Sequence, residues 1–262
     1  METKKLHIAS VSFGKDSVAM LLKLLEKKAE GSSVYPLDEV VFYDTGMEFG
    51  AIYHVRDQIK ELLDYYEVPL TVLTPERPFM YDMLERPVHS KQKGDHNGYG
   101  WCGGLCRWGT RNKLDALDRY AKERNAIVYI GIAVDEPQRL TRLEEYKRAP
   151  LAEWGMTEQE ALEFCWSKGI HWTEDPSDLS VPDLYKILDR VSCWCCCNKN
   201  QKELKNIYTY LPGYWDKLIE LQNKLERPMK RFRTDPVFGN LGDIRNLGAY
   251  WDDQKRQENK SA

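Results

Sequence analysis

The sequence predicts an α/β fold with a doubly wound parallel sheet, followed by a mainly helical region. Short apolar runs alternate with segments of helical spacing, which is the pattern of parallel strands joined by helices. The expected strands cover 6–11, 39–43, 70–73 and 126–132. No strand pattern returns after these runs. Further helices are expected at 157–168, 183–191, 199–210 and 215–225.

Local signals mark where these elements begin and end. Helices are predicted over 17–28 and 52–66, because apolar residues recur there at intervals of three and four. Thr157 is the expected N-cap of the helix at 157–168, and Glu160 completes a capping box. The glycine-rich stretch 86–110 is predicted to be a long loop, and loops of that length are usually functional or disordered.

Composition excludes several classes of protein. The chain has 262 residues, of which 42% are hydrophobic and 30% charged, so neither a membrane protein nor a disordered chain is expected. The net charge of −3 argues against a broad basic surface for duplex DNA. The first twelve residues lack the features of a signal peptide, so a cytoplasmic location without membrane contact is predicted. Seven clustered cysteines then indicate metal ligands or reactive thiols.

The segment from Ser10 to Ser17 has the features of an anion-binding loop. It lies between the first strand and the first helix, where an α/β sheet binds ligands. Gly14 permits close approach of the backbone, Lys15 supplies a charge, and the helix start supplies free amides. The spacing of a Walker A loop is absent.

This loop resembles the PP-loop, Ser-Gly-Gly-Lys-Asp-Ser, of ATP pyrophosphatases and of the phosphoadenosine phosphosulfate (PAPS) reductase family. Phe13 stands where the family has its first glycine, and we expect its side chain to narrow the loop. The stretches 41–46 and 131–136 are similar to the second strand end and to the Gly-x-Arg-x-Asp-Glu segment of that family, with Ala133 in place of the arginine. Residues 150–158 resemble its Pro-x-x-x-Trp-Thr-Glu region.

The resemblance implies a fold of the HUP/PP-loop type and an enzyme that cleaves ATP between its α and β phosphates. Such an enzyme adenylates an acceptor, in some members for sulfur transfer, so a transferase of sulfur metabolism is expected. Mg²⁺ would accompany the nucleotide, with Asp16 or Asp44 as ligands. Asp16 could instead orient the loop or satisfy the helix dipole, and Asp44 could instead bind a ribose hydroxyl or cap the next helix. The candidate catalytic residues are Lys15, Asp16, Asp135, Glu136 and Arg139. The candidate nucleotide-binding residues are Ser10, Ser12, Phe13, Gly14, Ser17, Asp44, Thr45, Gly131 and Arg142.

The cysteines form two spaced pairs that could complete one site with four ligands. Cys102 and Cys106 are spaced C-x3-C, and Cys193 and Cys196 are spaced C-x2-C. Ligation by thiolates alone suits zinc or a [4Fe–4S] cluster. Resemblance to iron–sulfur sulfonucleotide reductases and thiolation enzymes favours [4Fe–4S], with Zn²⁺ as the alternative. Cys165 is predicted to be a buried apolar residue instead.

The predicted domains are a nucleotide-binding domain at 1–150, a helical region for substrate and metal at 151–250, and a flexible tail at 251–262. The basic run 227–233 is either a solvated surface or a contact for a nucleic acid. The expected partners are an adenine nucleotide and, as open alternatives, a nucleic acid or a sulfur donor. The oligomeric state is not determined by the sequence.

Two alternative functions remain. A sulfonucleotide reductase would use a cysteine near its C-terminus, but no cysteine follows Cys197 in this chain. A module that binds metal, nucleotide or nucleic acid without catalysis is the other alternative, for which the departures at Phe13 and Ala133 argue.

Overall fold

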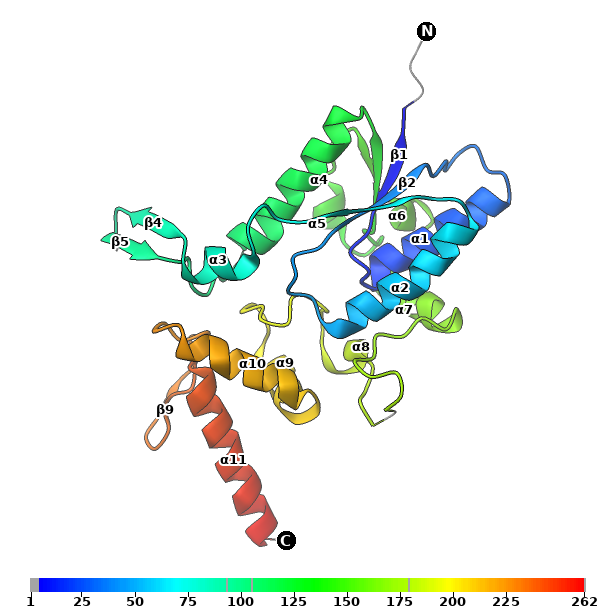
Figure 1. Ribbon diagram of the computed structural model, residues 1–262. Helices are drawn as coiled ribbons and strands as arrows, with labels where there is room; N and C mark the ends of the chain where they lie inside the picture. The colour runs from blue at the N-terminus through cyan, green and yellow to red at the C-terminus, as the bar shows by residue number, and fades with distance from the viewer. Residues whose placement is uncertain (1–4, 93, 105, 179, 262) are drawn as a thin grey trace. The chain divides into compact units, whose positions relative to one another are not determined.

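The chain folds into two units that alternate along the sequence (Figure 1). The computed structural model describes residues 5–92, 94–104, 106–178 and 180–261. Unit 1 comprises Met1–Pro75 and Thr110–Ser177, and unit 2 comprises Glu76–Gly109 and Asp178–Ala262. These interleaved units do not coincide with the linear division predicted at 150 and 250.

A five-stranded sheet with the order β3-β2-β1-β6-β7 forms the centre of unit 1, and all of its strand pairs are parallel. The predicted α/β class and parallel sheet are therefore confirmed. The fifth strand was not expected, because it is only two residues long and both residues are charged. The strands are β1 (His7–Ser10), β2 (Glu39–Tyr43), β3 (Leu70–Leu73), β6 (Ile127–Ile130) and β7 (Lys147–Arg148).

Helices cover both faces of this sheet. The chain moves outward from β1 through α1 and α2, and then returns to the other side of β1 through α4. Right-handed crossovers in opposite directions place helices on opposite faces, and Figure 1 shows α4 on the other side of the sheet from α1 and α2. The helices of unit 1 are α1 (Lys15–Ala29), α2 (Gly50–Tyr65), α4 (Asn112–Glu123), α5 (Pro137–Leu140), α6 (Pro150–Glu153) and α7 (Glu158–Ser167).

Two apolar layers hold unit 1 together. On one face, Ile8 and Val41 of the sheet pack with Ala121 of α4. On the other side, α1 buries a long apolar face that includes Val18, Leu21 and Leu25. Because α1 follows β1 after only four residues, this burial also fixes the intervening loop.

Unit 2 is mainly helical, as the sequence predicts for the C-terminal region. Its longer helices pack around an aromatic cluster in which Trp215 and Trp251 have ring centroids 5.5 Å apart. The helices are α3 (Phe79–Leu84), α8 (Leu184–Ile187), α9 (Gln201–Tyr210), α10 (Pro212–Asn223) and α11 (Ile244–Ser261). The strands are β4 (Pro87–Ser90), β5 (Gly94–Asn97), β8 (Thr234–Asp235) and β9 (Gly239–Asn240).

Two predictions for unit 2 need correction. The stretch 86–110 is not simply a loop, because β4 and β5 form an antiparallel hairpin and Arg107–Arg111 form a π-helical turn. The hairpin has no clear alternation of apolar and polar residues, which explains why its strands were missed. The predicted flexible tail at 251–262 coincides with the last turns of α11, so it has regular secondary structure within the described residues.

Among the described residues, no helix combines the length and apolar character needed to span a lipid bilayer.

Candidate functional site

The loop between β1 and α1 presents backbone amides at the carboxyl edge of the sheet. Gly14 is the N-cap of α1, and as a glycine it has no side chain that could cap the first amides of this helix. The Ser12 amide donates to Ser17 Oγ (3.2 Å), and that hydroxyl donates to the Gly14 carbonyl (3.0 Å). These bonds hold the loop in a fixed turn, and the N-terminal amides of a helix favour an anionic ligand.

Phe13 is in the left-handed backbone conformation, with a φ of 55°. This conformation costs a residue other than glycine about 1–2 kcal/mol, which explains why glycine suits the position. Here the side chain is fully buried and packs edge-on against Phe42, with ring centroids 5.0 Å apart. The Trp172 indole donates to the Phe13 carbonyl (2.7 Å). The expectation that Phe13 narrows the loop is wrong, because its side chain points into the core.

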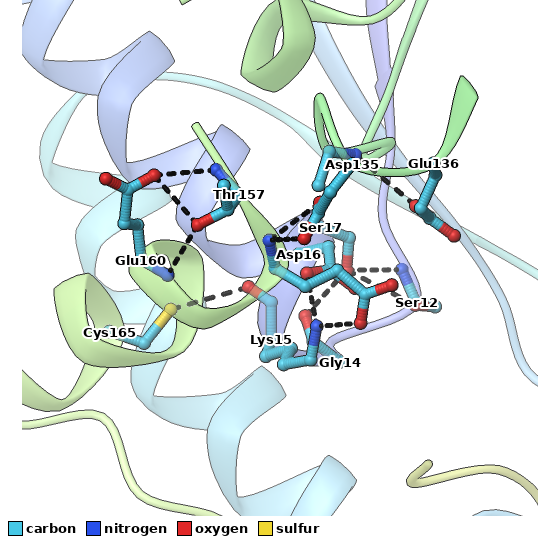
Figure 2. A network of polar contacts seen from close by, with 12 residues as sticks. Ser12, Gly14, Lys15, Asp16, Ser17, Asp135, Glu136, Thr157, Glu160 and Cys165 are labelled. Carbon is cyan, nitrogen blue, oxygen red and sulfur yellow. Dashed lines mark hydrogen bonds and ion pairs between the residues drawn. The ribbon is translucent and has the colours of Figure 1, made fainter. Parts of the chain in front are cut away.

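Lys15 lies at the centre of a cluster of carboxylates (Figure 2). Its ammonium donates to Asp16 Oδ1 (2.7 Å) and to Glu158 Oε2 (2.8 Å), while only 10% of its side chain is exposed. Burial alone would lower the pKa of Lys15, but the two carboxylates outweigh burial and the pKa is raised. The residue is therefore a fixed cation at the start of α1.

Asp16 carries an unfavourable negative charge. Burial raises its pKa, Lys15 partly opposes this effect, and the charges of Glu158 and Glu136 raise the pKa further. A divalent cation bound beside Asp16 would offset this repulsion, and the oxygen donors match the preference of Mg²⁺. Within the described residues, no three His, Cys, Asp or Glu side chains form a ready metal site. Mg²⁺ commonly needs only one or two carboxylates together with phosphate oxygens.

The segment after β6 connects α7 to this cluster. Asp135 accepts from the Glu158 amide (3.1 Å) at the start of α7. Thr157 and Glu160 form the predicted capping box, which is confirmed. Glu158 was missed as a site residue, although it ends the 150–158 segment that carries part of the family resemblance.

Gly131, at the end of β6, makes the close packing of this edge possible. A Cβ atom there would lie 2.7 Å from the Ser17 amide nitrogen, so only glycine lets β6 approach the start of α1. The structure thus brings Gly131 and the Asp135 segment to the same edge of the sheet as the loop between β1 and α1. Ser10, the last residue of β1, pairs with Ile130 at the end of β6 and with Val41 in the middle of β2.

The two arginines predicted in this region are in different states. Arg139 donates to both carboxylate oxygens of Glu136 (2.6 and 2.8 Å), and Glu136 also accepts from the Ala133 amide (3.3 Å). Arg142 is exposed. A nucleotide would have to compete with Glu136 for Arg139, whereas Arg142 is accessible.

Asp44 and Thr45 follow β2 and are bound within their own segment. Asp44 Oδ1 accepts from the Gly46 amide and from the Tyr53 hydroxyl, both at 2.8 Å. Thr45 Oγ1 donates to Glu48 (3.1 Å). Burial and the bond to Asp44 raise the pKa of Tyr53, so its hydroxyl stays protonated and remains a donor. Tyr53 was not predicted, and a lone tyrosine in a helix gives no sequence signal for this role.

The predicted metal ligands all belong to unit 2. The Asn198 side chain donates to the Gly104 carbonyl and accepts from the Gly104 amide, both at 2.8 Å. This pair of hydrogen bonds joins the segment of Cys102 and Cys106 to the segment of Cys193 and Cys196. All four cysteines are half-buried.

The thiols of the two segments are close enough to influence one another electrostatically. Burial raises the pKa of Cys195, and charges on Cys193, Cys196 and Cys106 raise it further. Burial likewise raises the pKa of Cys197 to about 11. Four sulfur donors from two linked segments are of the kind that binds zinc or an iron–sulfur cluster, although the thiols of the described residues are not arranged as a ready ligand group.

Cys165 lies outside this cluster, in unit 1. It is fully buried, and its thiol donates to the Lys15 carbonyl (3.4 Å). Burial raises its pKa to about 12. The prediction that Cys165 is a buried apolar residue is confirmed.

Comparison with known proteins identifies the family of this chain. Over 221 residues it is 26% identical to the uncharacterized protein MJ0066 of Methanocaldococcus jannaschii; the match covers 82% of this chain but only 41% of that protein. It is also similar to the solved structure of the U34-tRNA thiolase NcsA from Methanococcus maripaludis with its [4Fe–4S] cluster. That match has 16% identity and a TM-score of 0.44, and covers 92% of this chain and 83% of the other. The model of the phosphoadenosine phosphosulfate reductase domain matches residues 7–158, and the chain belongs to this family.

Proposed function

We propose that unit 1 binds ATP with Mg²⁺ and transfers its AMP moiety to an acceptor. An acceptor oxygen or sulfur attacks the α-phosphorus, the bond from that phosphorus to the α–β bridging oxygen breaks, and pyrophosphate leaves with the electron pair. The acceptor proton passes to solvent. The observation that carries this proposal is the N-terminus of α1, which begins at Gly14, beside the buried cation of Lys15.

Lys15 is the candidate for stabilising the leaving pyrophosphate. Its ammonium is paired with Asp16 and Glu158. Phosphate oxygens would replace these partners, and the released carboxylates would be available to Mg²⁺. Because the cation is held before the reaction, it needs little reorganisation as charge grows on the leaving group.

The remaining predicted residues suit the other parts of the nucleotide. Ser10, Ser12, Gly14 and Ser17 lie along the phosphate loop. Asp44 and Thr45 at the end of β2, and Gly131 at the end of β6, are proposed to contact the adenosine. Exposed Arg142 would supply a further cation, and Arg139 would do so after leaving Glu136. Asp135 holds the start of α7 and so positions Glu158.

For unit 2 we propose that Cys102, Cys106, Cys193 and Cys196 bind a [4Fe–4S] cluster, with Zn²⁺ as the alternative. The support is an all-sulfur donor set drawn from two segments that Asn198 joins. A bound cluster would supply redox or sulfur-handling chemistry, which suits a transfer of sulfur to the adenylated acceptor. Lys230 supports the second segment by donating to the carbonyls of Cys197 (2.6 Å) and Lys199 (2.7 Å).

Nucleotide turnover tests the first part of the proposal. We expect labelled ATP to yield AMP or an AMP adduct together with pyrophosphate, in a reaction that requires Mg²⁺. Release of ADP and phosphate, or no nucleotide binding, would contradict the proposal. Anaerobic purification tests the second part: we expect brown protein with visible absorbance, whereas colourless protein with stoichiometric zinc would select the alternative metal.

The family match supports a second candidate, reduction of a sulfonucleotide. It ranks lower because the carboxylates beside Lys15 suit a nucleotide that carries Mg²⁺. Sulfite release from adenylyl sulfate or PAPS, without ATP, would reverse this order.

A further inference from the structure

A large cavity of unit 2 lies beside the cysteine segments, and none of the residues assigned to the nucleotide lines it. Its volume is about 1030 Å³, at the upper limit of the roughly 300–1,000 Å³ typical of small-molecule pockets. The hairpin β4–β5 contributes one part of the wall, and Cys102, Cys197 and the basic run 227–231 contribute others. The cavity is therefore large enough for part of an extended ligand.

The lysine and arginine side chains in the wall of this cavity are not balanced by carboxylates among the described residues. Lys91, Arg227, Lys230 and Arg231 line it, and among the described residues of its wall there is no aspartate or glutamate. The whole chain, by contrast, has a net charge of −3. Lys91, Arg227 and Arg231 are exposed, and the described residues provide no ion-pair partner for any of these three. This concentration of cations without counter-charge favours an anionic ligand.

The wall also offers surfaces for a ring. Tyr99 and Trp101 both line the cavity. Trp101 is only 4% exposed, and its indole nitrogen is buried without a hydrogen-bond partner among the described residues. A buried N–H group without a partner is unfavourable, so an acceptor on a ligand that reached it would stabilise this position.

The basic run is held in place by buried contacts. Gln222 is fully buried; its amide donates to the carbonyls of Leu225 (2.9 Å) and Arg227 (3.0 Å) and accepts from the Met229 amide (3.0 Å). The ammonium of Lys230 then binds the run to residues 193–199, which we call the cysteine loop. The cations are therefore presented by a fixed turn, which distinguishes them from a solvated charge run.

We propose that this cavity binds a single-stranded nucleic acid, with Lys91, Arg227 and Arg231 at its phosphates and Tyr99 stacked on a base. Cations that follow a backbone, together with aromatic faces, are the features of sequence-tolerant binding to single strands. A strand bound here would lie beside Cys102 and Cys197. The inference names the acceptor class for the proposed adenylation and in that respect rests on the proposed function, although binding itself requires no ATP.

Fluorescence anisotropy of the full chain with labelled twelve-nucleotide RNA and DNA strands tests the proposal. We expect the double variant Arg227→Gln/Arg231→Gln to bind about tenfold or more weakly. Its plot of log K against log salt should be less steep by about 1.4, since each phosphate contact on a single strand contributes about 0.7. The matched control, Lys255→Gln/Arg256→Gln, removes two exposed cations from α11 and should bind as the wild type does.

A second pair of variants tests stacking on Tyr99. Tyr99→Phe should retain binding, and Tyr99→Ala should lose roughly 5- to 150-fold, which corresponds to about 1–3 kcal/mol per stacked base. Preference for RNA or for DNA would identify the acceptor. Circular dichroism and thermal melting check that each variant is folded.

The proposal is overturned if the wild type binds neither strand, or if the α11 control weakens binding as much as the cavity variant. Displacement of the strands by inorganic sulfate at equal affinity would assign the cavity to a small anion instead. Loss of strand binding with intact ATP cleavage would remove this inference alone. The opposite result, strand binding without any nucleotide turnover, would remove the proposed enzymatic function.

Discussion

The loop between β1 and α1 in unit 1, proposed above as a phosphate loop, and the cysteine loop at 193–199 in unit 2 are both irregular turns. They are held in different ways. The phosphate loop is enclosed by regular elements, with β1 before it, α1 after it and Phe13 anchored in the core. The cysteine loop depends on individual side chains, namely Asn198 and Lys230. The first site is therefore formed before any ligand binds, whereas we expect the second to be completed by its metal.

The largest expected effect concerns the first loop. Lys15→Ala should lower the rate of ATP cleavage by about 100-fold or more, since removal of one positioned donor costs about 2.7–4 kcal/mol in comparable sites. The protein should remain folded, because the β1–α1 turn is held by Ser17 and Phe13, which this variant retains. Steady-state kinetics and circular dichroism measure both properties. Lys27→Ala, which removes a half-buried lysine from the last turn of the same helix, is the control and should be as active as the wild type.

A substitution in the cysteine loop should lower stability, whereas Lys15→Ala should leave the protein folded. Cys193→Ser is expected to lose the metal and thermal stability together, because binding energy contributes directly to folding at a site that the metal completes. Metal analysis and melting of the anaerobically purified protein test this expectation. Cys165→Ala removes a buried thiol of unit 1 and should keep its full metal content. Retention of metal by the Cys193 variant would exclude that residue as a ligand.

The anchor of the phosphate loop allows a sharper test. Phe13→Ala should reduce the free energy of unfolding by about 3–5 kcal/mol. Phe13→Gly should cost less than Phe13→Ala, because glycine relieves the left-handed strain of about 1–2 kcal/mol. At Phe42, in the regular strand β2, the order should reverse, since glycine there is about 0.5–1 kcal/mol worse than alanine. Denaturant titration of the four variants decides, and the same order at both positions would contradict the strain argument.

The smallest effect compares a carboxylate from each unit. The pKa of Asp16 is raised in the folded protein, so its ionised form is destabilising and the wild type loses stability as the pH rises through this pKa. Asp16→Asn should therefore increase the free energy of unfolding at pH 7 by about 0.5–2 kcal/mol and melt at a higher temperature, while it loses activity. Below the unfolded pKa of about 3.9 the carboxyl is protonated in both states, so this advantage should disappear.

The ionised carboxylate of Asp243 stabilises the folded protein, whereas that of Asp16 destabilises it. Burial raises its pKa, but the hydrogen bonds from Arg245 outweigh burial and lower it. Its contribution to stability is therefore present above the unfolded pKa and is lost as the pH falls through the folded one. Asp243→Asn should melt lower than the wild type at pH 7. Melting curves between pH 3 and 8 test both residues, and parallel pH profiles for the two variants would refute the assignment of opposite signs.

The sequence by itself determined the sheet, the helices that follow its first strands and the position of the phosphate loop. Apolar spacing and a few turn residues encode these features locally, which is also why the capping box at Thr157 could be predicted. The clustering of cysteines likewise needed only their spacing.

Only the tertiary structure decided which distant side chains complete the sites. Glu158 reaches Lys15 across 143 positions of the chain, and Trp172 holds the Phe13 carbonyl from 159 positions away. The left-handed conformation of Phe13 and the cavity beside the cysteine loop also arise from packing. Such contacts depend on how elements pack in space, and neither helical nor strand periodicity carries that information, because each repeats over only a few residues.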